Sequence, residues 1–214
     1  GIQHGTITAV ADGQPFEVTT LREDVETMGR HAKVAFTQDW VGDASRRDFT
    51  INALFCDPDG TLYDPTGGLA DLKAGRVRFV GQASQRIAED YLRILRFFRI
   101  HAHYGKGAPD AEALAACKTH AQGLGNLSAE RIAAELLRLL GAPNPESVMR
   151  LMEAAGVLAQ VLPEATNFAR LKGLTHLDSA DPDPLRRLAA VIAVDAQTTE
   201  AMALRLKLSN DHRR

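Results

Sequence analysis

The stretch SQRIAEDYLRILRFFRIHAHYG, residues 84–105, divides the chain into two parts of different character. Its apolar residues recur at the spacing of an amphipathic helix, namely at Ile87, Tyr91, Ile94 and Phe98. Gly105 follows as a typical helix end. We therefore expect one long helix here.

Helical patterns with their own start and stop residues continue after this stretch. They cover 110–124, 128–141 with Ser128 as cap, and 144–156 with Asn144 as cap and Pro145 in the first turn. Two more helices are expected from Pro184 and from about Thr198. Because strand signals of comparable strength are confined to residues before 82, this part is predicted to be all-helical.

The first 81 residues have the pattern of strands and turns. Alternating residues around Asp12-Gly13 predict a hairpin over 4–21, and Asp59-Gly60 predicts a second one. Residues 22–45 show no clear period and are expected to form a mobile loop or a broken helix. Residues 45–55 are expected to form a short helix capped by Ser45, and 75–80 an extended segment. The fold class is therefore α+β.

The composition and net charge of the chain limit the classes of function that it can have. The chain has 214 residues, 45% of them hydrophobic and 24% charged, which is ordinary for a globular protein. The net charge of −2 argues against a strongly basic nucleic-acid binder. Without a signal peptide or a long apolar run, we expect a cytoplasmic protein that does not bind membranes. Cys56 and Cys117 are expected to be free, buried thiols.

The residues RRDFTIN, 46–52, combine two cations with polar groups at a predicted helix start. Arg46 and Arg47 would add guanidinium groups to the backbone N–H groups there, which suits a triphosphate. Asp48 and Asn52, four residues apart, would share a helix face and hold a ribose hydroxyl. The alternative is a charged helix start with a capping aspartate.

Asp90 and Arg93 offer a second polar pair. At i,i+3 on a helix they would present an acceptor and a rigid fork of donors to the edge of a planar base. The alternative is a solvent-exposed salt bridge worth about 0.3–0.5 kcal/mol. Glu17 in the first hairpin is either a solvent-facing strand residue or a metal ligand. The motifs HExxH, Walker A and the serine nucleophile elbow are absent from the sequence.

The order of these motifs carries more information than any one of them. The segments HGTITAV, FEVTTLREDVETMGRHAKVAF, DASRRDFTINALFCDPDGTLYDPTGGLADL, SQRIAEDYLRILRFFRIHAHYG and LSAERIAAELLRLL follow one another over residues 4–140. This series closely resembles the class II tRNA nucleotidyltransferase and bacterial poly(A) polymerase family. The resemblance implies the C-terminal part of a polymerase-beta-like head over 1–81, a helical neck over 82–141, and a helical body and the start of a tail over 142–214.

The resemblance also implies a reaction and a set of residues. The family adds C and A nucleotides to tRNA 3′ ends from CTP and ATP, without a nucleic-acid template and with Mg²⁺. By resemblance, the sugar and triphosphate are held by Arg46, Arg47, Asp48 and Asn52, and the base is read by Asp90 and Arg93. Head and neck movements are linked by Asp64, Gly67, Gly68 and Asp71, and the neck is buttressed by Glu130 and Arg131. Glu17 takes the place of a third catalytic, metal-binding carboxylate.

One departure from the family changes the expectation for this chain. The family's Gly-Gly…Arg-Asp turn and Asp-x-Asp pair precede the HGT strand, whereas this sequence begins at Gly1, just before it. Two-metal phosphoryl transfer needs several converging carboxylates. We therefore expect a fragment that is inactive alone, although the full-length protein is an enzyme; nucleotide incorporation above background would contradict this.

Two alternatives stay open on the sequence. One is a poly(A) polymerase, or an enzyme of the same family that adds only CC or only A. The other is a noncatalytic module that binds RNA or nucleotides. The sequence leaves the oligomeric state open.

Overall fold

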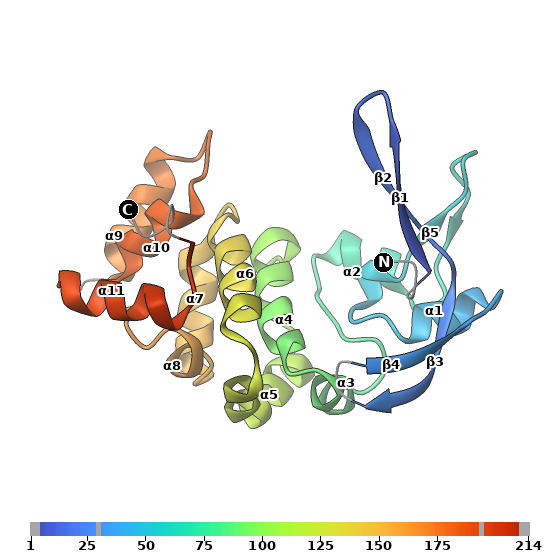
Figure 1. The fold of residues 1–214 in the computed structure, drawn as a ribbon, viewed down its shortest axis with the longest axis horizontal. Coiled ribbons are helices and arrows are strands. Elements are labelled where there is room, and N and C mark those ends of the chain that lie inside the picture. Colours follow the sequence, from blue (N-terminus) through green and yellow to red (C-terminus); the bar gives the residue numbers. More distant parts are fainter. Residues whose placement is uncertain (1–4, 29–30, 193–194, 210–214) are drawn as a thin grey trace.

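The computed structural model describes residues 5–28, 31–192 and 195–209. A β-rich part with two small helices is followed by a helical part, and the two meet near α3 and α4 (Figure 1). Within the described residues, the last strand ends at Tyr63. The α+β class with an all-helical second part is confirmed. None of the helices in these ranges is long and apolar enough to cross a membrane.

Both predicted hairpins form where the Asp-Gly pairs indicated them. Strands β1 (Thr6–Ala11) and β2 (Gln14–Thr19) pair antiparallel. Asp12 and Gly13 turn the chain between them with φ of 50° and 76°, the left-handed values that a tight hairpin requires. Strands β5 (Phe55–Cys56) and β6 (Leu62–Tyr63) form the second hairpin around Gly60.

The expectation for residues 22–45 was wrong. Strands β3 (Arg22–Met28) and β4 (His31–Phe36) form a third antiparallel hairpin, and α1 (Trp40–Ser45) follows. The register of β3 against β4 shifts between Asp24 and Glu26. Such a bulge interrupts the two-residue alternation by which a strand is recognised in a sequence.

The short helix expected over 45–55 is also wrong. Ser45 ends α1 instead of capping a new helix, and only the 3₁₀ turn η2 (Thr50–Asn52) follows. Between them the chain is extended at Phe49, which forms an antiparallel bridge with Phe79. Thr50 N–H donates to the Arg78 carbonyl at 3.0 Å, so the predicted extended segment 75–80 lies against the RRDFTIN segment.

The long helix predicted over 84–105 is divided into α3 (Ala83–Glu89) and α4 (Leu92–Tyr104). The backbone leaves the helical region at Asp90, where φ is −155° and ψ is 109°. The Asp90 carboxylate accepts the N–H of Leu92 at 3.1 Å, so it caps the start of α4. Apolar periodicity alone does not report such a break, because the pattern continues across it.

Most of the helices predicted after residue 105 are present in the structure. Patterns after residue 105 correspond to α5 (Ala111–His120) with the 3₁₀ turn η3 (Ala121–Asn126), α6 (Ala129–Leu140), α7 (Pro145–Ala154), α10 (Pro184–Val191) and α11 (Ala196–Arg205). Three short helices were not predicted, namely α2 (Gly68–Ala74), α8 (Leu158–Val161) and α9 (Phe168–Leu177).

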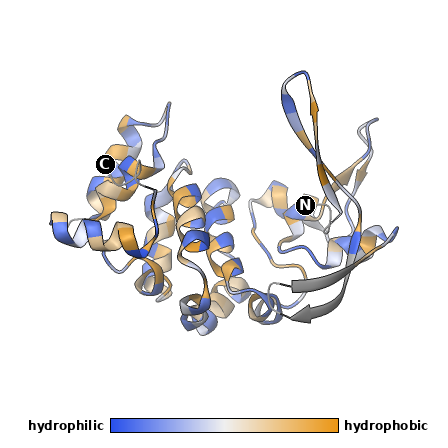
Figure 2. Ribbon diagram, in the orientation of Figure 1, coloured by the Kyte–Doolittle hydropathy of each residue, from blue (hydrophilic) through white to orange (hydrophobic). Residues whose placement is uncertain are grey.

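An aromatic cluster joins the two parts of the molecule. The rings of Phe49 and Phe79 lie 4.8 Å apart, and Phe79 stacks on Phe97 of α4 at 5.9 Å. All three side chains are fully or almost fully buried in the main hydrophobic core, which includes residues of the later helices. Hydrophobic residues recur along those helices (Figure 2). This packing fixes the RRDFTIN segment against α4. Cys117 is buried as expected, whereas Cys56 is exposed, since β5 lies at the surface.

Candidate functional site

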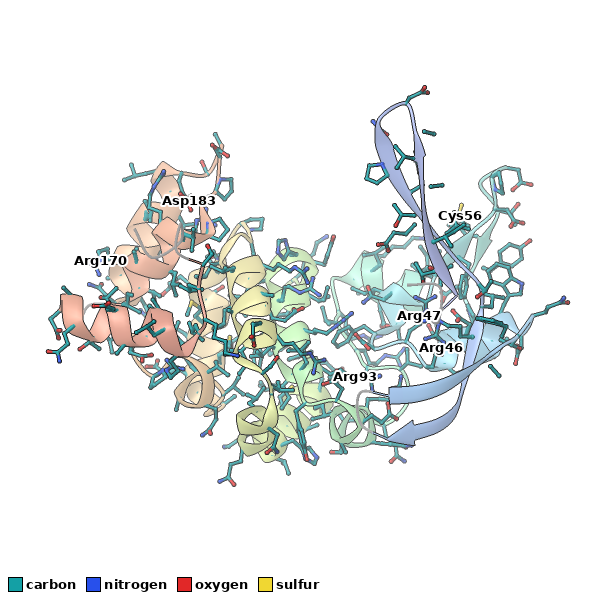
Figure 3. The ribbon with its side chains drawn as sticks, viewed as in Figure 1. Arg46, Arg47, Cys56, Arg93, Arg170 and Asp183 are labelled. Atoms are coloured by element: carbon teal, nitrogen blue, oxygen red, sulfur yellow. The ribbon has the colours of Figure 1, made fainter. Side chains whose placement is uncertain are left out.

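The candidate residues gather where the RRDFTIN segment meets the first helices of the helical part. Arg46, Arg47 and Arg93 lie close together there, away from Arg170 at the far end of the molecule (Figure 3).

Arg46 and Arg47 are held by one buried carboxylate, that of Asp43 in α1. Asp43 Oδ1 accepts Nε and Nη2 of Arg46 at 3.0 and 2.6 Å, and Oδ2 accepts Nε and Nη2 of Arg47 at 3.1 and 2.7 Å. Burial opposes ionisation of Asp43, but the two arginines outweigh it and hold the pKa of this carboxyl below its usual value. The guanidinium groups are therefore fixed side by side.

Asp48 points toward α4 and not along a helix shared with Asn52. Its Oδ1 accepts Nε of Arg93 at 3.0 Å, and its Oδ2 forms an ion pair with Nε of Arg96 at 2.6 Å. Asn52 lies in η2 with an exposed side chain. The expected common face of Asp48 and Asn52 is therefore wrong, because no helix spans the two residues.

Asp90 and Arg93 do not pair with each other. Asp90 Oδ2 accepts Nη2 of Arg131 at 2.6 Å, whereas Arg93 binds Asp48, the carbonyl of Arg86 and the carboxylate of Glu89. The break between α3 and α4 removes the i,i+3 arrangement on which both sequence interpretations depended. The structure places Arg93 beside the RRDFTIN segment through its contact with Asp48, whereas the Asp90 carboxylate binds Arg131 and the Leu92 N–H.

Arg86 connects α3 to the same segment. Its Nη2 donates to the carbonyls of Arg46 and Arg47, the latter at 2.8 Å. Its Nη1 donates to both oxygens of Glu89, at 3.0 and 2.8 Å. Five arginines thus share three carboxylates, a surplus of two positive charges among the described members of this group: Arg46, Arg47, Arg86, Arg93 and Arg96 against Asp43, Asp48 and Glu89. Such an excess favours an anionic ligand.

The DPTGGLADL motif supports this segment from the other side. Asp64 accepts the N–H groups of Gly68 and Leu69 at 2.7 and 3.0 Å and so caps α2. The buried Asp71 accepts the Thr50 hydroxyl at 2.7 Å and binds Arg76 and Arg78. The motif thus ties α2 to η2.

Gly68 is required by a close backbone approach. A Cβ atom at this position would lie 2.1 Å from the Thr50 carbonyl oxygen, whereas Gly173 in α9 has open space around it. We expect Gly68→Ala to lower the free energy of unfolding by about 1–3 kcal/mol, since backbone must move. Gly173→Ala, the matched control, should be neutral or stabilising. Urea unfolding of both variants checks this; equal effects would contradict it.

The motif's aspartates also predict a pH dependence. Burial would raise the pKa of Asp71, but Thr50, Arg76 and Arg78 lower it overall, and backbone N–H groups do the same for Asp64. A carboxyl whose pKa is lower in the folded state stabilises the fold above its unfolded pKa and loses this effect as the pH falls.

We therefore expect the melting temperature to be flat near neutral pH and to fall below about pH 4, where unfolded aspartates begin to bind protons. Melting curves at intervals between pH 7 and 3 measure this. A melting temperature that stayed constant over that range would contradict the assignment.

Glu130 and Arg131 begin α6 and link it to two other elements. Arg131 binds Asp90 at the α3–α4 break, and Glu130 accepts Nζ of Lys207, beyond α11, at 2.8 Å. The hydrogen bond from Lys207 lowers the pKa of the exposed Glu130. By binding Asp90, Arg131 fixes a residue that the family resemblance associates with base reading.

The residues described do not fit a Mg²⁺ site. Glu17 is exposed on β2, opposite Thr8 in the register, and no three potential ligands from histidine, cysteine, aspartate or glutamate converge within the described ranges. Asp43, Asp48 and Asp71 are engaged by arginines. The metal role of Glu17 stays a prediction.

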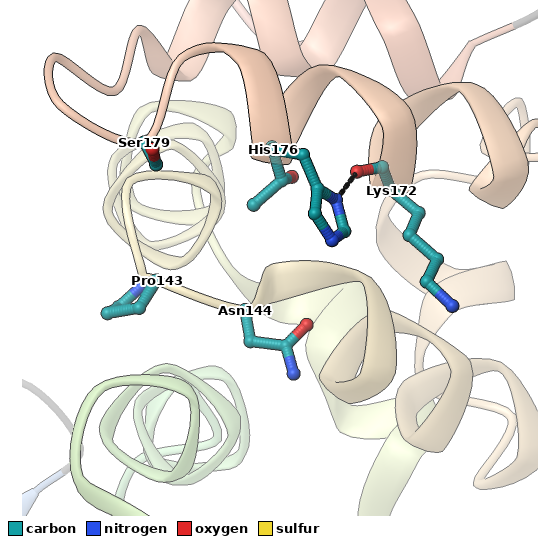
Figure 4. A pocket seen from close by; sticks show the side chains of 6 residues that line it. Pro143, Asn144, Lys172, His176 and Ser179 are labelled. Atoms are coloured by element: carbon teal, nitrogen blue, oxygen red, sulfur yellow. Dashed lines mark hydrogen bonds between the residues drawn. The ribbon is translucent and has the colours of Figure 1, made fainter.

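A separate hollow of about 400 Å³ lies between the α6–α7 connection and α9 (Figure 4). It is lined by Pro143, Asn144, Lys172, Thr175, His176 and Ser179. His176 Nδ1 lies 2.7 Å from the Lys172 carbonyl in its own helix. None of the binding or catalytic residues predicted from the sequence lines this hollow.

Sequence reasoning missed four residues of the group: Asp43, Arg86, Glu89 and Arg96. Local spacing offered a signal for three of them. Asp43 precedes the arginine pair by three and four residues, Arg86 precedes Glu89 by three, and Glu89 precedes Arg93 by four. The contact of Arg96 with Asp48 joins residues far apart in the chain and has no local signal.

Comparisons with known proteins identify two family models and several relatives that resemble this chain. Residues 1–78 match a family model described as the poly A polymerase head domain, and 108–168 match one described as a probable RNA and SrmB-binding site of polymerase A. A mitochondrial CCA tRNA nucleotidyltransferase of Mus musculus is 44% identical over 220 residues, covering 100% of this chain and 50% of the relative. The chain belongs to the family of CCA-adding enzymes and poly(A) polymerases.

Bacterial members of the CCA-adding family match as well. The CCA-adding enzyme of Streptococcus uberis is 42% identical over 146 residues, 67% of this chain and 36% of the relative. The crystal structure of the Bacillus stearothermophilus CCA-adding enzyme in complex with CTP superposes with a TM-score of 0.69 at 29% identity, over 98% of this chain and 48% of that one. The chain spans about half the length of the curated relatives it matches.

Proposed function

We propose that the arginine-rich group at residues 46–96 binds a nucleoside triphosphate. The observation that carries the proposal is the Asp48–Arg93 ion pair, which brings the RRDFTIN segment to the start of α4. Arg46 and Arg47 supply two fixed guanidinium groups for the phosphates, and the surplus of two positive charges among the described residues of the group matches an anionic ligand. The sugar would then lie near Asp48 and Asn52.

Asp90 and Arg93 supply the chemistry to choose the base. A carboxylate only accepts hydrogen bonds and a guanidinium only donates them. Cytosine and adenine each offer an amino donor beside a ring-nitrogen acceptor on the pairing edge, whereas uracil and guanine offer a carbonyl beside a ring N–H. Asp90 and Arg93 together thus complement C and A and leave unpaired groups against U and G.

In the whole protein, we propose that this site adds C and A nucleotides to tRNA 3′ ends without a template. The support is the identity to proteins named CCA tRNA nucleotidyltransferase and CCA-adding enzyme. Mg²⁺ would supply the charge neutralisation that phosphoryl transfer needs. The cytoplasmic location stays a prediction, because the mouse, zebrafish and human relatives are mitochondrial by name.

Cross-linking with azido-ATP tests the site. We expect labelled peptides from residues 46–52 or 86–104, with labelling competed by CTP and ATP and not by UTP. Competition by ATP alone would favour a poly(A) polymerase. Labelling confined to α7–α11, or not competed by any nucleotide, would contradict the proposal.

A further inference from the structure

We propose that Asp43 is a positioning residue for the triphosphate, because it holds Arg46 and Arg47 in one fixed arrangement. This inference rests on the proposed nucleotide site. Asp43 itself makes no contact with a nucleotide in the proposal. It acts through the two arginines.

The geometry of Asp43, Arg46 and Arg47 determines which N–H donors of the two arginines a ligand can use. Asp43 is fully buried, and it uses the Nε–Nη2 edge of each guanidinium group. A guanidinium group has five N–H donors, so the Nη1 side of each arginine keeps its donors for another acceptor. The side chains of Arg46 and Arg47 stay 17% and 38% exposed, so a ligand can reach them.

Electrostatics requires a group such as Asp43 between the arginines. Two neighbouring guanidinium groups repel each other, and they would separate without an anion between them. The buried carboxylate offsets this repulsion but removes only one of the two positive charges. The pair therefore keeps a net charge that favours phosphate.

Asp43 also connects the pair to the β3–β4 hairpin. Its Oδ1 accepts the backbone N–H of Arg22 at 3.0 Å, while Arg46 Nε donates to the Arg22 carbonyl at 2.8 Å. The start of β3, the end of α1 and both arginines thus share one carboxylate. A change at Asp43 is expected to alter the direction of both guanidinium groups.

Asparagine is the informative substitution. In Asp43→Asn one carboxylate oxygen becomes an NH₂ group, which donates and cannot accept from a guanidinium group. One arginine stays bound and the other loses its acceptor. Asp43→Glu keeps both acceptor oxygens and serves as the conservative variant. Asp178→Asn is the matched control, since Asp178 is also buried and bound by one arginine, Arg187, far from the site.

The test measures equilibrium binding of CTP, CDP and CMP to the chain and its variants. We expect the unaltered chain to bind CTP more tightly than CMP. Asp43→Asn should weaken CTP binding about tenfold and leave CMP binding unchanged, and Asp43→Glu should recover part of the loss. Asp178→Asn should lower the melting temperature without changing the ratio of CTP to CMP affinity.

The outcomes separate this inference from the proposed function. If the unaltered chain prefers CTP and Asp43→Asn keeps that preference, the positioning role is wrong and the nucleotide site stands. If Asp178→Asn loses the preference as much as Asp43→Asn, the effect is one of stability and the positioning role is again wrong. If the unaltered chain binds CTP no better than CMP, both proposals are wrong.

Discussion

Replacing Arg93 by alanine is expected to abolish the preference of the chain for CTP over UTP. Arg93 is the proposed donor to the base, and its side chain is oriented by Asp48, Glu89 and the Arg86 carbonyl. A bidentate contact to a base contributes about 1–3 kcal/mol of discrimination. The affinity ratio of CTP to UTP should therefore fall by about 10- to 100-fold.

Two further variants make this expectation specific. Arg93→Lys keeps the charge but not the planar fork, so it should also lose most of the discrimination. Arg99→Ala is the matched control: Arg99 lies in the same helix and pairs with the nearly buried Glu135 at 2.6 Å. It should reduce stability and leave the ratio unchanged. Fluorescence titrations with both nucleotides measure this; a ratio retained in Arg93→Ala would contradict the role of Arg93.

Replacing Arg187 by methionine is expected to produce the largest loss of stability. The fully buried Arg187 binds Asp178 through Nε and Nη2, the latter at 2.7 Å, and donates from Nη1 to the carbonyls of Leu140 and Ala142, each at 2.7 Å. Removing it leaves a carboxylate and two carbonyl groups without their donor. Breaking one side of a buried ion pair costs about 3–5 kcal/mol.

The neighbouring Arg186 provides the control for this prediction. Its side chain is 60% exposed and pairs with Asp183 at 3.5 Å, so Arg186→Met should change the free energy of unfolding by less than about 1 kcal/mol. Urea unfolding of both variants compares them. Similar losses for the two variants would show that burial of the Arg187 pair does not determine its contribution.

Local signals predicted the elements that local residues determine. The Asp12-Gly13 turn of the first hairpin and Pro145 in the first turn of α7 follow from backbone preferences within a few residues. The helix break at Asp90 was missed because the apolar periodicity continues across it, and one of the contacts that hold it comes from Arg131, forty-one residues later. Long-range pairing of this kind has no periodic signature in the sequence.

In the candidate site, too, local signals identified residues, whereas long-range contacts had no signal in the sequence. The sequence indicated Arg46, Arg47, Asp48, Asp90 and Arg93, and the structure places them at one junction. The sequence offers no signal for the long-range partners, since Asp48 is bound by Arg93 and Arg96 of another element. The expected helix shared by Asp48 and Asn52 failed because the Phe49–Phe79 bridge holds the segment extended.

The most direct test of the account is equilibrium binding of ATP, CTP, GTP and UTP to the unaltered chain without magnesium. The proposed pairing of Asp90 and Arg93 with the base predicts that CTP and ATP bind at least about tenfold more tightly than UTP and GTP. Equal affinities for all four nucleotides, or no measurable binding of any of them, would contradict the claim that residues 46–96 form a base-selective nucleotide site.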